Sequence, residues 1–428
     1  MIVARPFRAL HYDPAAVDMD TVLAPPYDVI DDPERDELYA RSDYNAVRLI
    51  LSKEEDRYAA AGRDLAAWRD RGVLVRDEVS NYYLYAQEFA MPDGSMRERS
   101  GILASVRLEE FAAGNIMPHE RTFPKAKADR MKIMEACRAN LSPIFGIYPS
   151  ADPSVAALCE RTRGGAPWID ARDNRGGRHR VWKIGDTEAV AAMRAGFADT
   201  RVFIADGHHR YETALEYRDR RRRAGGGEHE SFNYVLMYLC PMDESGLVIL
   251  PTHRLWCGGR GSADGWLEKL KGAFAVEPVP VSGAAELQRC LAGETERGVM
   301  AVRLRGESGA FLLRPRDWAA VERALSQVPP TLRELDVTVL DAFVFGQLLG
   351  VDYLADTEAG RVVYTHEDER AFVSTDSGEA EAAFFLRATR IEEVQRVCLA
   401  GEVMPQKSTY FHPKLQTGLV FHLLDDDE

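Results

Sequence analysis

The sequence carries few of the features that mark membrane, secreted or metal-ribbon proteins. Its 428 residues include six cysteines, and no two of them form a Cys-x-x-Cys pair, which excludes a zinc knuckle and a thioredoxin-type redox motif. No run of 18 apolar residues occurs, so no transmembrane helix is expected. The first ten residues contain Arg5, Pro6 and Arg8 but no apolar signal-peptide core. We therefore predict a cytoplasmic protein with no membrane partner.

Motifs that would assign a common enzyme class are also absent. The chain has no Gly-x-x-x-x-Gly-Lys-Ser/Thr loop and no His-Glu-x-x-His sequence, so neither a P-loop enzyme nor a metalloprotease of that type is expected. The formal net charge of −14 argues against a general binder of nucleic acids or anionic membranes. With 46% apolar and 29% charged residues, the composition is that of a globular protein, and its 428 residues suffice for two or three domains.

The most informative segment that is present is residues 202–215. The apolar run from Val202 to Ala205 predicts a buried strand, and the pattern that follows the next turn predicts a helix. Backbone N–H groups at a helix N-terminus attract anions, and a glycine lets a ligand approach the backbone closely. The segment therefore predicts a phosphate-binding site, with an ordinary Asp206 N-cap and solvated first-turn residues as the alternative. The residues of the turn are Asp206, Gly207, His208, His209 and Arg210.

A second charged segment begins at His119 and enters a predicted helix. Glu120 is a candidate general base or metal ligand, and Lys127 and Arg130 are candidates for neutralising phosphate charge. The alternative is the exposed start of a helix with ordinary charge pairs three and four residues apart.

Residues 404–414 combine two lysines, two aliphatic hydroxyl groups and a histidine around two prolines. A basic loop with hydroxyl groups suits a phosphate or carboxylate ligand, whereas the alternative is an exposed loop that leads into the apolar end of the chain. The candidate ligand-binding residues here are Lys407, Ser408, Thr409 and Lys414.

Two shorter signals accompany these segments. Tandem prolines fix the backbone before Tyr27 and Asp28, so this turn either holds those side chains at a site or is a plain structural turn. His253 and Arg254 follow a predicted strand, and ligands collect at strand ends in α/β sheets.

Predicted strands and helices alternate irregularly along the chain, which indicates a mixed α/β (α+β) fold without repeats. The composition becomes polar and rich in glycine between Cys257 and Gly265. We therefore predict an N-terminal α/β domain over 1–260, which carries the 206–210 turn, and a C-terminal α+β domain over 261–428, whose 404–414 loop returns to the site. A long apolar helix is predicted over 335–349.

Taken together, these motifs resemble a bacterial protein family known as domain of unknown function 1015. The resemblance covers nearly the whole chain, although the family name implies no activity. The matching segments are residues 25–30, 119–122 with 127–130, 140–145, 204–214, 250–254 and 404–411.

The turn at 206–210 also resembles the phosphate-binding loop of the ParB/sulfiredoxin superfamily, which includes CTP-hydrolysing partition proteins, ATP-using sulfiredoxins and free-serine kinases. The resemblance implies a ParB/sulfiredoxin-like core around residues 202–215 with additional α+β elements. Sulfiredoxins carry a reactive cysteine in this turn, which is absent here, and the net charge of −14 disfavours a DNA-partition protein. The turn is most similar to that of the free-serine kinases, which implies serine or phosphoserine as substrate.

We therefore expect a phosphotransferase or phosphatase that acts on a small hydroxy-amino acid. Gly207 and the N–H groups after it would cradle phosphate, while His208, His209 and Arg210 would offset the charge on the transferred group. Asp206 or Glu120 would serve as base, and Asp206 is the candidate ligand of Mg²⁺. The residues expected to hold distal phosphates or the substrate carboxylate are Lys127, Arg130, Lys407 and Lys414.

A kinase of this kind would use ATP, ADP or another phosphate donor, and its partner would be a small molecule rather than nucleic acid. Two alternatives stay open. One is a nucleotide-binding regulatory module of ParB-like type that responds to CTP or ATP. The other is a metal-dependent hydrolase whose ligands are Asp206, His208 and His209. The sequence does not specify an oligomeric state.

Overall fold

The computed structural model describes residues 1–122, 124–150, 152–258 and 265–425. These residues form two compact units. The first unit comprises Met1–Pro118, Thr122–Leu247 and the C-terminal segment from Pro413, and the second comprises His119–Arg121 and Val248–His412. The domain division predicted at residue 260 stays a prediction. In the structure, the chain passes from the first unit to the second at Val248 and returns to the first at Pro413. The C-terminal segment thus returns to the first unit.

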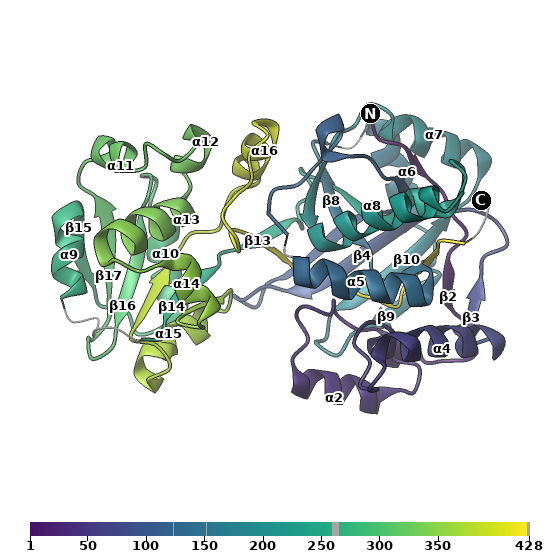
Figure 1. Ribbon diagram of the computed structural model, residues 1–428, viewed down its shortest axis with the longest axis horizontal. Helices are drawn as coiled ribbons and strands as arrows, with labels where there is room; N and C mark the ends of the chain where they lie inside the picture. The colour runs from purple at the N-terminus through teal and green to yellow at the C-terminus, as the bar shows by residue number, and fades with distance from the viewer. Residues whose placement is uncertain (123, 151, 259–264, 426–428) are drawn as a thin grey trace. The chain divides into compact units, whose positions relative to one another are not determined.

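The described part of the first unit is built on a nine-stranded sheet of mixed direction (Figure 1). Its main path runs β6-β11-β8-β12-β5-β4-β10-β9, and β1 pairs with β5. The pairs β6–β11 and β8–β12 are parallel, and the other pairs are antiparallel. The bounds are β1 Ala4–Arg5, β4 Tyr82–Ala90, β5 Met96–Arg107, β6 Ile116–Met117, β8 Ile144–Tyr148, β9 Ile169–Arg172, β10 Arg178–Ile184, β11 Val202–Asp206 and β12 Tyr234–Pro241.

The longest strand pair, β4–β5, follows from its turn sequence. Residues 91–95 read Met-Pro-Asp-Gly-Ser, and Gly94 adopts φ +82°, which favours glycine. The N–H of Met91 donates to the carbonyl of Ser95 at 2.7 Å and closes the hairpin. Both faces of β4 are largely buried, so its polar side chains lie inside the unit.

Helices cover this sheet, and several begin at an aspartate whose side chain accepts N–H groups of the first turn. Asp31, Asp56, Asp152 and Asp186 cap α2, α4, α6 and α7 in this way. Helix α8 packs on β8 and β12, and α5 packs beside α8. The bounds are α1 Met19–Val22, α2 Asp32–Arg41, α3 Val47–Ile50, α4 Arg57–Asp70, α5 Pro124–Cys137, α6 Pro153–Arg163, α7 Thr187–Phe197 and α8 His208–Arg223.

The core of the first unit lies between these helices and the sheet. The strand predicted from Val202 and the helix predicted after the turn are confirmed as β11 and α8. Short ladders, β2 (Leu10–Tyr12) with β3 (Leu74–Arg76) and β7 (Ala139–Asn140) with β21 (His422–Leu423), tie the chain ends to this unit. Core side chains include Tyr82, Ile144, Phe197, Val202, Ile204, Tyr211, Met237 and Leu239.

The second unit holds a six-stranded antiparallel sheet in the order β15-β17-β16-β19-β14-β18. Helices α10 and α15 pack against it, and Leu255, Leu287, Leu312 and Phe385 belong to its core. The strand bounds are β13 Val248–Leu250, β14 His253–Trp256, β15 Phe274–Val279, β16 Met300–Leu304, β17 Ala310–Pro315, β18 Val362–Thr365, β19 Ala382–Phe385 and β20 Tyr410–His412. The helix bounds are α9 Trp266–Ala273, α10 Ala284–Ala292, α11 Trp318–Ala324, α12 Pro330–Arg333, α13 Asp336–Thr338, α14 Tyr353–Glu358, α15 Asp368–Ser377 and α16 Ile391–Leu399.

The helix expected over 335–349 is present but has a different geometry. After α13, residues Val339–Leu349 (η3) form a π-helix that ends at Gly350 with φ +75°. An apolar pattern over this length does not distinguish hydrogen bonds spanning four residues from those spanning five. π-Helical turns are rare and frequently occur at functional positions. Here the π-helix carries the buried carboxylate of Asp341.

The mixed α/β fold class predicted from the sequence is confirmed by the two sheets and their helices. Across the described ranges, every helix is too short or too polar to traverse a lipid bilayer.

Candidate functional site

The predicted phosphate-binding turn lies where β11 ends and α8 begins. Asp206 is the last residue of the strand, and Gly207, with φ +93°, is the N-cap of the helix. The alternative in which Asp206 caps the helix is therefore wrong, because no side chain makes a cap hydrogen bond at this N-terminus. The Asp206 carboxylate is instead available to other partners.

Arg210 folds back over the turn and binds this carboxylate. Its Nη2 donates to Oδ2 of Asp206 at 2.6 Å, and its Nη1 donates to the carbonyl of Pro143. A Cβ at position 207 would lie 3.0 Å from the Arg210 guanidinium. The positive φ therefore favours glycine at this position, and a Cβ here would also displace the end of the Arg210 side chain.

Substitution Gly207→Ala is expected to destabilise the protein by about 2–3 kcal/mol, since it adds a contact with Arg210 to the cost of a left-handed alanine. Gly225→Ala is the matched control, because Gly225 has φ +97° and nothing lies within 4 Å of the position that its Cβ would occupy. Urea denaturation should show a smaller loss for Gly225→Ala. Equal losses would show that the Arg210 contact adds nothing.

Lys414 supplies a second cation to the same carboxylate. Its Nζ pairs with Oδ1 of Asp206, and the side chains of Lys414, Asp206 and Arg210 are 11%, 14% and 13% exposed. Burial would raise the pKa of Asp206, but Lys414, Arg210 and His208 lower it far below its usual range. A carboxylate held so strongly in its ionised form is a poor general base, which favours a role for Asp206 as the counter-ion that fixes two cations.

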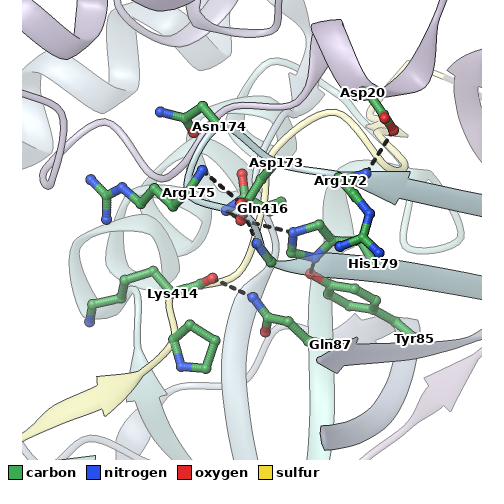
Figure 2. Close-up of polar contacts among 12 residues, drawn as sticks. Asp20, Tyr85, Gln87, Arg172, Asp173, Asn174, Arg175, His179, Lys414 and Gln416 are labelled. Carbon is green, nitrogen blue, oxygen red and sulfur yellow. Dashed lines mark hydrogen bonds and ion pairs between the residues drawn. The ribbon is translucent and has the colours of Figure 1, made fainter. Parts of the chain in front are cut away.

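Two buried side chains hold the backbone that carries Lys414. Gln87 on β4 donates to the Lys414 carbonyl at 2.8 Å, as Figure 2 shows. Arg99 on β5 donates to the Pro413 carbonyl at 2.7 Å and to Oε1 of Gln87 at 2.6 Å. The position of Lys414 therefore depends on two neighbouring strands of the sheet, β4 and β5.

The same segment is held two residues further on by Asp173. Nε2 of Gln416 donates to Oδ2 of Asp173 at 3.1 Å, and Nε2 of His179 donates to the same oxygen at 2.9 Å (Figure 2). His179 Nδ1 then accepts the hydroxyl of Tyr85 at 2.8 Å. Burial opposes the ionised form of Asp173, but the hydrogen bond from His179 lowers its pKa. The network keeps the C-terminal segment in one conformation.

Lys127 and Arg130 of α5 lie in the first unit with the turn. Lys127 Nζ pairs with Oε2 of Glu212 on α8 at 2.7 Å, and Thr122 donates to the same oxygen at 2.8 Å. The guanidinium of Arg130 lies 3.7 Å from the ring centroid of Tyr27. Both predicted cations are thus engaged with protein partners beside α8.

Asp28 is exposed and makes no hydrogen bond or ion pair with any residue that the structure describes. It therefore contributes no fixed contact to the turn that holds Tyr27.

The candidates His119, Glu120, Lys407, Ser408 and Thr409 meet in the second unit. Nε2 of His119 lies 2.8 Å from the hydroxyl of Thr409. The N–H of Lys407 donates to Oε1 of Glu120 at 3.1 Å, and the Ser408 carbonyl accepts Thr389 at 2.8 Å. The 404–409 loop is therefore fixed on several sides.

His253 and Arg254, which we predicted as ligand-binding residues, are fully buried against protein partners. Arg254 makes two 3.2 Å contacts with Asp341 of the π-helix and donates to the Lys407 carbonyl at 3.1 Å. Nε2 of His253 lies 2.6 Å from Oδ1 of Asp368. These geometries favour a positioning role, in which Arg254 anchors the 404–409 loop.

Lys407 has φ +55°, an unfavourable conformation for a residue with a Cβ. Lys407→Gly is expected to raise the free energy of unfolding by about 0.5–1 kcal/mol, because it relieves this backbone cost. Arg138→Gly is the matched control, since Arg138 has φ +47° directly after α5. Thermal unfolding should show a gain in both variants. A loss confined to Lys407→Gly would show that its side chain stabilises the loop.

Across the described residues, no three His, Cys, Asp or Glu side chains are grouped closely enough to share a metal ion. Asp206, His208 and His209, the ligand set of the predicted metal-dependent hydrolase, are therefore not gathered as such a group. The counter-ion role of Asp206 toward Lys414 and Arg210 accounts for this carboxylate instead.

Residues 4–338 match the protein family described as "Protein of unknown function (DUF1015)". The chain belongs to this family. The match confirms the family that the motifs resemble, and it includes the 206–210 turn, although the 404–411 motif lies beyond the matched range. No curated protein matches the chain.

Several solved structures are similar over most of their own length, at low identity. A conserved hypothetical protein from Pyrococcus furiosus is 15% identical with a TM-score of 0.33, and the match covers 72% of this chain and 93% of that chain. A mutant free serine kinase in complex with ADP is 13% identical, with a TM-score of 0.35 and coverage of 72% and 89%. C-terminally truncated SbnI from Staphylococcus aureus is 12% identical, with a TM-score of 0.36 and coverage of 76% and 90%.

Proposed function

We propose that this protein transfers a phosphoryl group to or from a small hydroxy-amino acid such as serine. The phosphate would bind at the 206–210 turn. The observation that carries the proposal is the convergence of two cations, Arg210 and Lys414, on one carboxylate at the N-terminus of α8. This arrangement supplies more positive than negative charge at a helix end that itself favours anions.

The cations are fixed before a ligand arrives, which is the property that phosphoryl transfer requires of its charge-stabilising groups. Asp206 orients both side chains, and Gln87 and Arg99 fix the backbone of Lys414. His208 is buried and His209 is half-buried in the first turn of α8. We assign His209 to the charge that develops on the transferred group, and Arg210 and Lys414 to the bound phosphate.

The donor would be ATP, ADP or another phosphate compound, with Mg²⁺ as the expected counter-ion. Mg²⁺ sites in phosphoryl-transfer enzymes are completed largely by phosphate oxygens and water, so Asp206 need not leave Arg210 and Lys414 for the ion to bind.

The test measures phosphoryl transfer in both directions, with serine plus ATP or ADP and with phosphoserine, in the presence of Mg²⁺. Wild-type protein should turn over at least one of these substrate combinations. His209→Ala should lose this turnover while keeping the thermal unfolding midpoint of the wild type. Turnover at the wild-type rate in His209→Ala would refute the role of His209.

A thermal-shift series with ATP, ADP, CTP, pyrophosphate, serine and phosphoserine accompanies the assay. A ligand at a hundredfold excess over its Kd stabilises the native state by about 2.7 kcal/mol. The absence of a shift with every phosphate compound would contradict the proposal, and a shift with a nucleotide but no turnover would favour the regulatory module instead.

A further inference from the structure

A small pocket opens beside Arg210 in the first unit. Its volume is about 40 Å³. Its walls come from the Tyr27 turn, α5, the segment 139–144, the start of α8 and β12. The lining residues are Tyr27, Ile50, Arg130, Ile133, Met134, Ala139, Asn140, Leu141, Ser142, Ile144, Arg210 and Val235.

Most of this lining is apolar, and its uncharged polar side chains are Tyr27, Asn140 and Ser142. The Ser142 hydroxyl is already hydrogen-bonded to that of Thr417 at 2.6 Å. Within the described ranges, the hydroxyl of Tyr27 has no hydrogen-bond partner. Asn140 is only 5% exposed, and its Oδ1 already accepts the N–H of Leu236 at 3.0 Å and lies 3.1 Å from Nδ1 of His422. Its Nδ2 has no partner in the described structure. A phenol and an amide NH₂ therefore remain for a ligand.

Two guanidinium groups complete the polar lining. Arg210 contacts Asp206, and Arg130 contacts Asp129 and the carbonyl of Ile50. Each of these arginines shares its carboxylate with a second cation, since Lys414 also pairs with Asp206 and Arg57 also pairs with Asp129. Both clusters therefore hold more positive than negative charge, which favours an anionic ligand.

The size of the pocket limits what this anion can be. A water molecule needs about 10–15 Å³ of such space, so the pocket has room for about three water-sized groups. A carboxylate has three heavy atoms, whereas a phosphate has five and a nucleobase more. Acceptor oxygens, a negative charge and this small space agree on a carboxylate as the part of a ligand that enters the pocket.

We infer that this pocket is a carboxylate subsite, in which Tyr27 and Asn140 donate to a small carboxylate beside Arg210. The link to substrate rests on the proposed function: Arg210 lines the pocket and also binds Asp206 in the turn. A hydroxy-amino acid would place its carboxylate in the pocket and direct its hydroxyl toward the phosphate at α8. The substrate class is accordingly a small hydroxy acid with a free carboxylate.

The test uses the full chain and NMR titration with acetate and its neutral isostere acetamide. Acetate should bind and acetamide should not. Tyr27→Phe should weaken acetate binding roughly tenfold, which is the usual effect of losing one hydrogen bond to a charged group. Asn140→Asp keeps the acceptor oxygen and replaces the donor with a carboxylate, so it should abolish acetate binding.

Tyr217→Phe is the matched control, because the Tyr217 hydroxyl lies 3.2 Å from Arg221 and does not line the pocket. It should bind acetate like the wild type. Equal binding of acetate and acetamide, or an unchanged affinity in Tyr27→Phe, would overturn the subsite. Tyr27→Phe is the decisive variant, because phenylalanine keeps the ring that Arg130 contacts and removes only the hydroxyl.

Two further measurements separate this inference from the proposed function. Pyrophosphate should shift the unfolding midpoint of Tyr27→Phe as much as that of the wild type. Acetate binding that depends on Tyr27, in a protein without phosphoryl transfer, would uphold the subsite and refute the proposed function. Phosphoryl transfer in a protein that does not bind acetate would refute the subsite alone.

Discussion

Lys414→Met should destabilise the protein and weaken phosphate binding, which makes it the variant with the largest expected effect on the candidate site. The substitution leaves the nearly buried carboxylate of Asp206 with Arg210 alone. Removing the only partner of a buried charge costs about 3–5 kcal/mol. Because Arg210 remains, we expect a loss of about 2–3 kcal/mol in the free energy of unfolding. Urea denaturation at pH 7 measures it.

The expected pH dependence follows from the lowered pKa of Asp206. A carboxyl group with a depressed folded pKa stabilises the native state above its unfolded pKa, and this contribution disappears as the pH falls. Without Lys414 the folded pKa of Asp206 should rise toward its usual value. The variant should therefore lose less stability than the wild type when the pH is lowered from 5 to 3.

A double-mutant cycle with Asp206→Asn separates the ion pair from side-chain packing. The double variant should lose less stability than the sum of the two single losses, because each single substitution removes the same Lys414–Asp206 ion pair. Pyrophosphate binding should fall about tenfold or more in Lys414→Met, since a hydrogen bond to a charged group contributes about 1.5–3 kcal/mol, and Lys414→Arg should retain most of it. Strictly additive losses in the cycle would contradict the pairing.

The strand, the turn and α8 could be predicted because their signals are local. An apolar β-branched run, a glycine and a helical pattern lie within residues 202–215, and the fold keeps all three. The β4–β5 hairpin was predictable for the same reason, since its turn sequence specifies the backbone.

The partners of the turn could not be predicted, because they are distant in sequence. Lys414 is 208 residues from Asp206, and only folding shows that they meet. Gln87 and Arg99 lie within strands whose pattern indicates burial, so their role in holding the 413–414 backbone had no signal of its own. A buried polar residue in a strand that is covered on both faces is the one hint that the sequence offers.

His253 and Arg254 gave a sequence signal for ligand binding, but in the structure both side chains have protein partners. Charged residues after a strand suggested a ligand, but the partner of Arg254 is Asp341, which the π-helix presents. Composition does not distinguish a cation that awaits a ligand from one that a buried carboxylate already neutralises. Arg254 and Arg210 look alike in the sequence, and in the structure each pairs with a carboxylate. They differ because Asp206 binds Lys414 as well and Arg210 lines a pocket, which Arg254 does not border.

Lowering the pH should destabilise the protein through His422. The expected loss in the free energy of unfolding grows with every pH unit below about 6.5. The ring is fully buried, with Nδ1 at 3.1 Å from Oδ1 of Asn140 and Nε2 at 3.2 Å from the hydroxyl of Ser105. Because the Asn140 oxygen is an acceptor, Nδ1 carries the proton and Nε2 accepts, which is the neutral form. Burial, followed by the charges of Arg5 and Arg76, lowers the pKa of His422 to about 3.

Between the unfolded pKa of about 6.5 and the folded pKa of about 3, the unfolded chain binds one proton more than the native protein. This contribution to stability is complete above pH 6.5 and is lost as the pH falls, by about 1.4 kcal/mol per unit. His422→Gln should cost about 1–2 kcal/mol at pH 7 through poorer hydrogen bonds, yet should remove this slope. Urea denaturation from pH 7.5 to 4.5 compares His422→Gln with His229→Gln, a control substitution in an exposed loop. The curve of stability against pH for His229→Gln should run parallel to that of the wild type. Two pH units below 6.5 change the stability of the wild type by about 2.8 kcal/mol through this one proton. The curves of His422→Gln and the wild type should therefore cross near pH 5.5. Parallel curves would show that folding does not lower the pKa of His422.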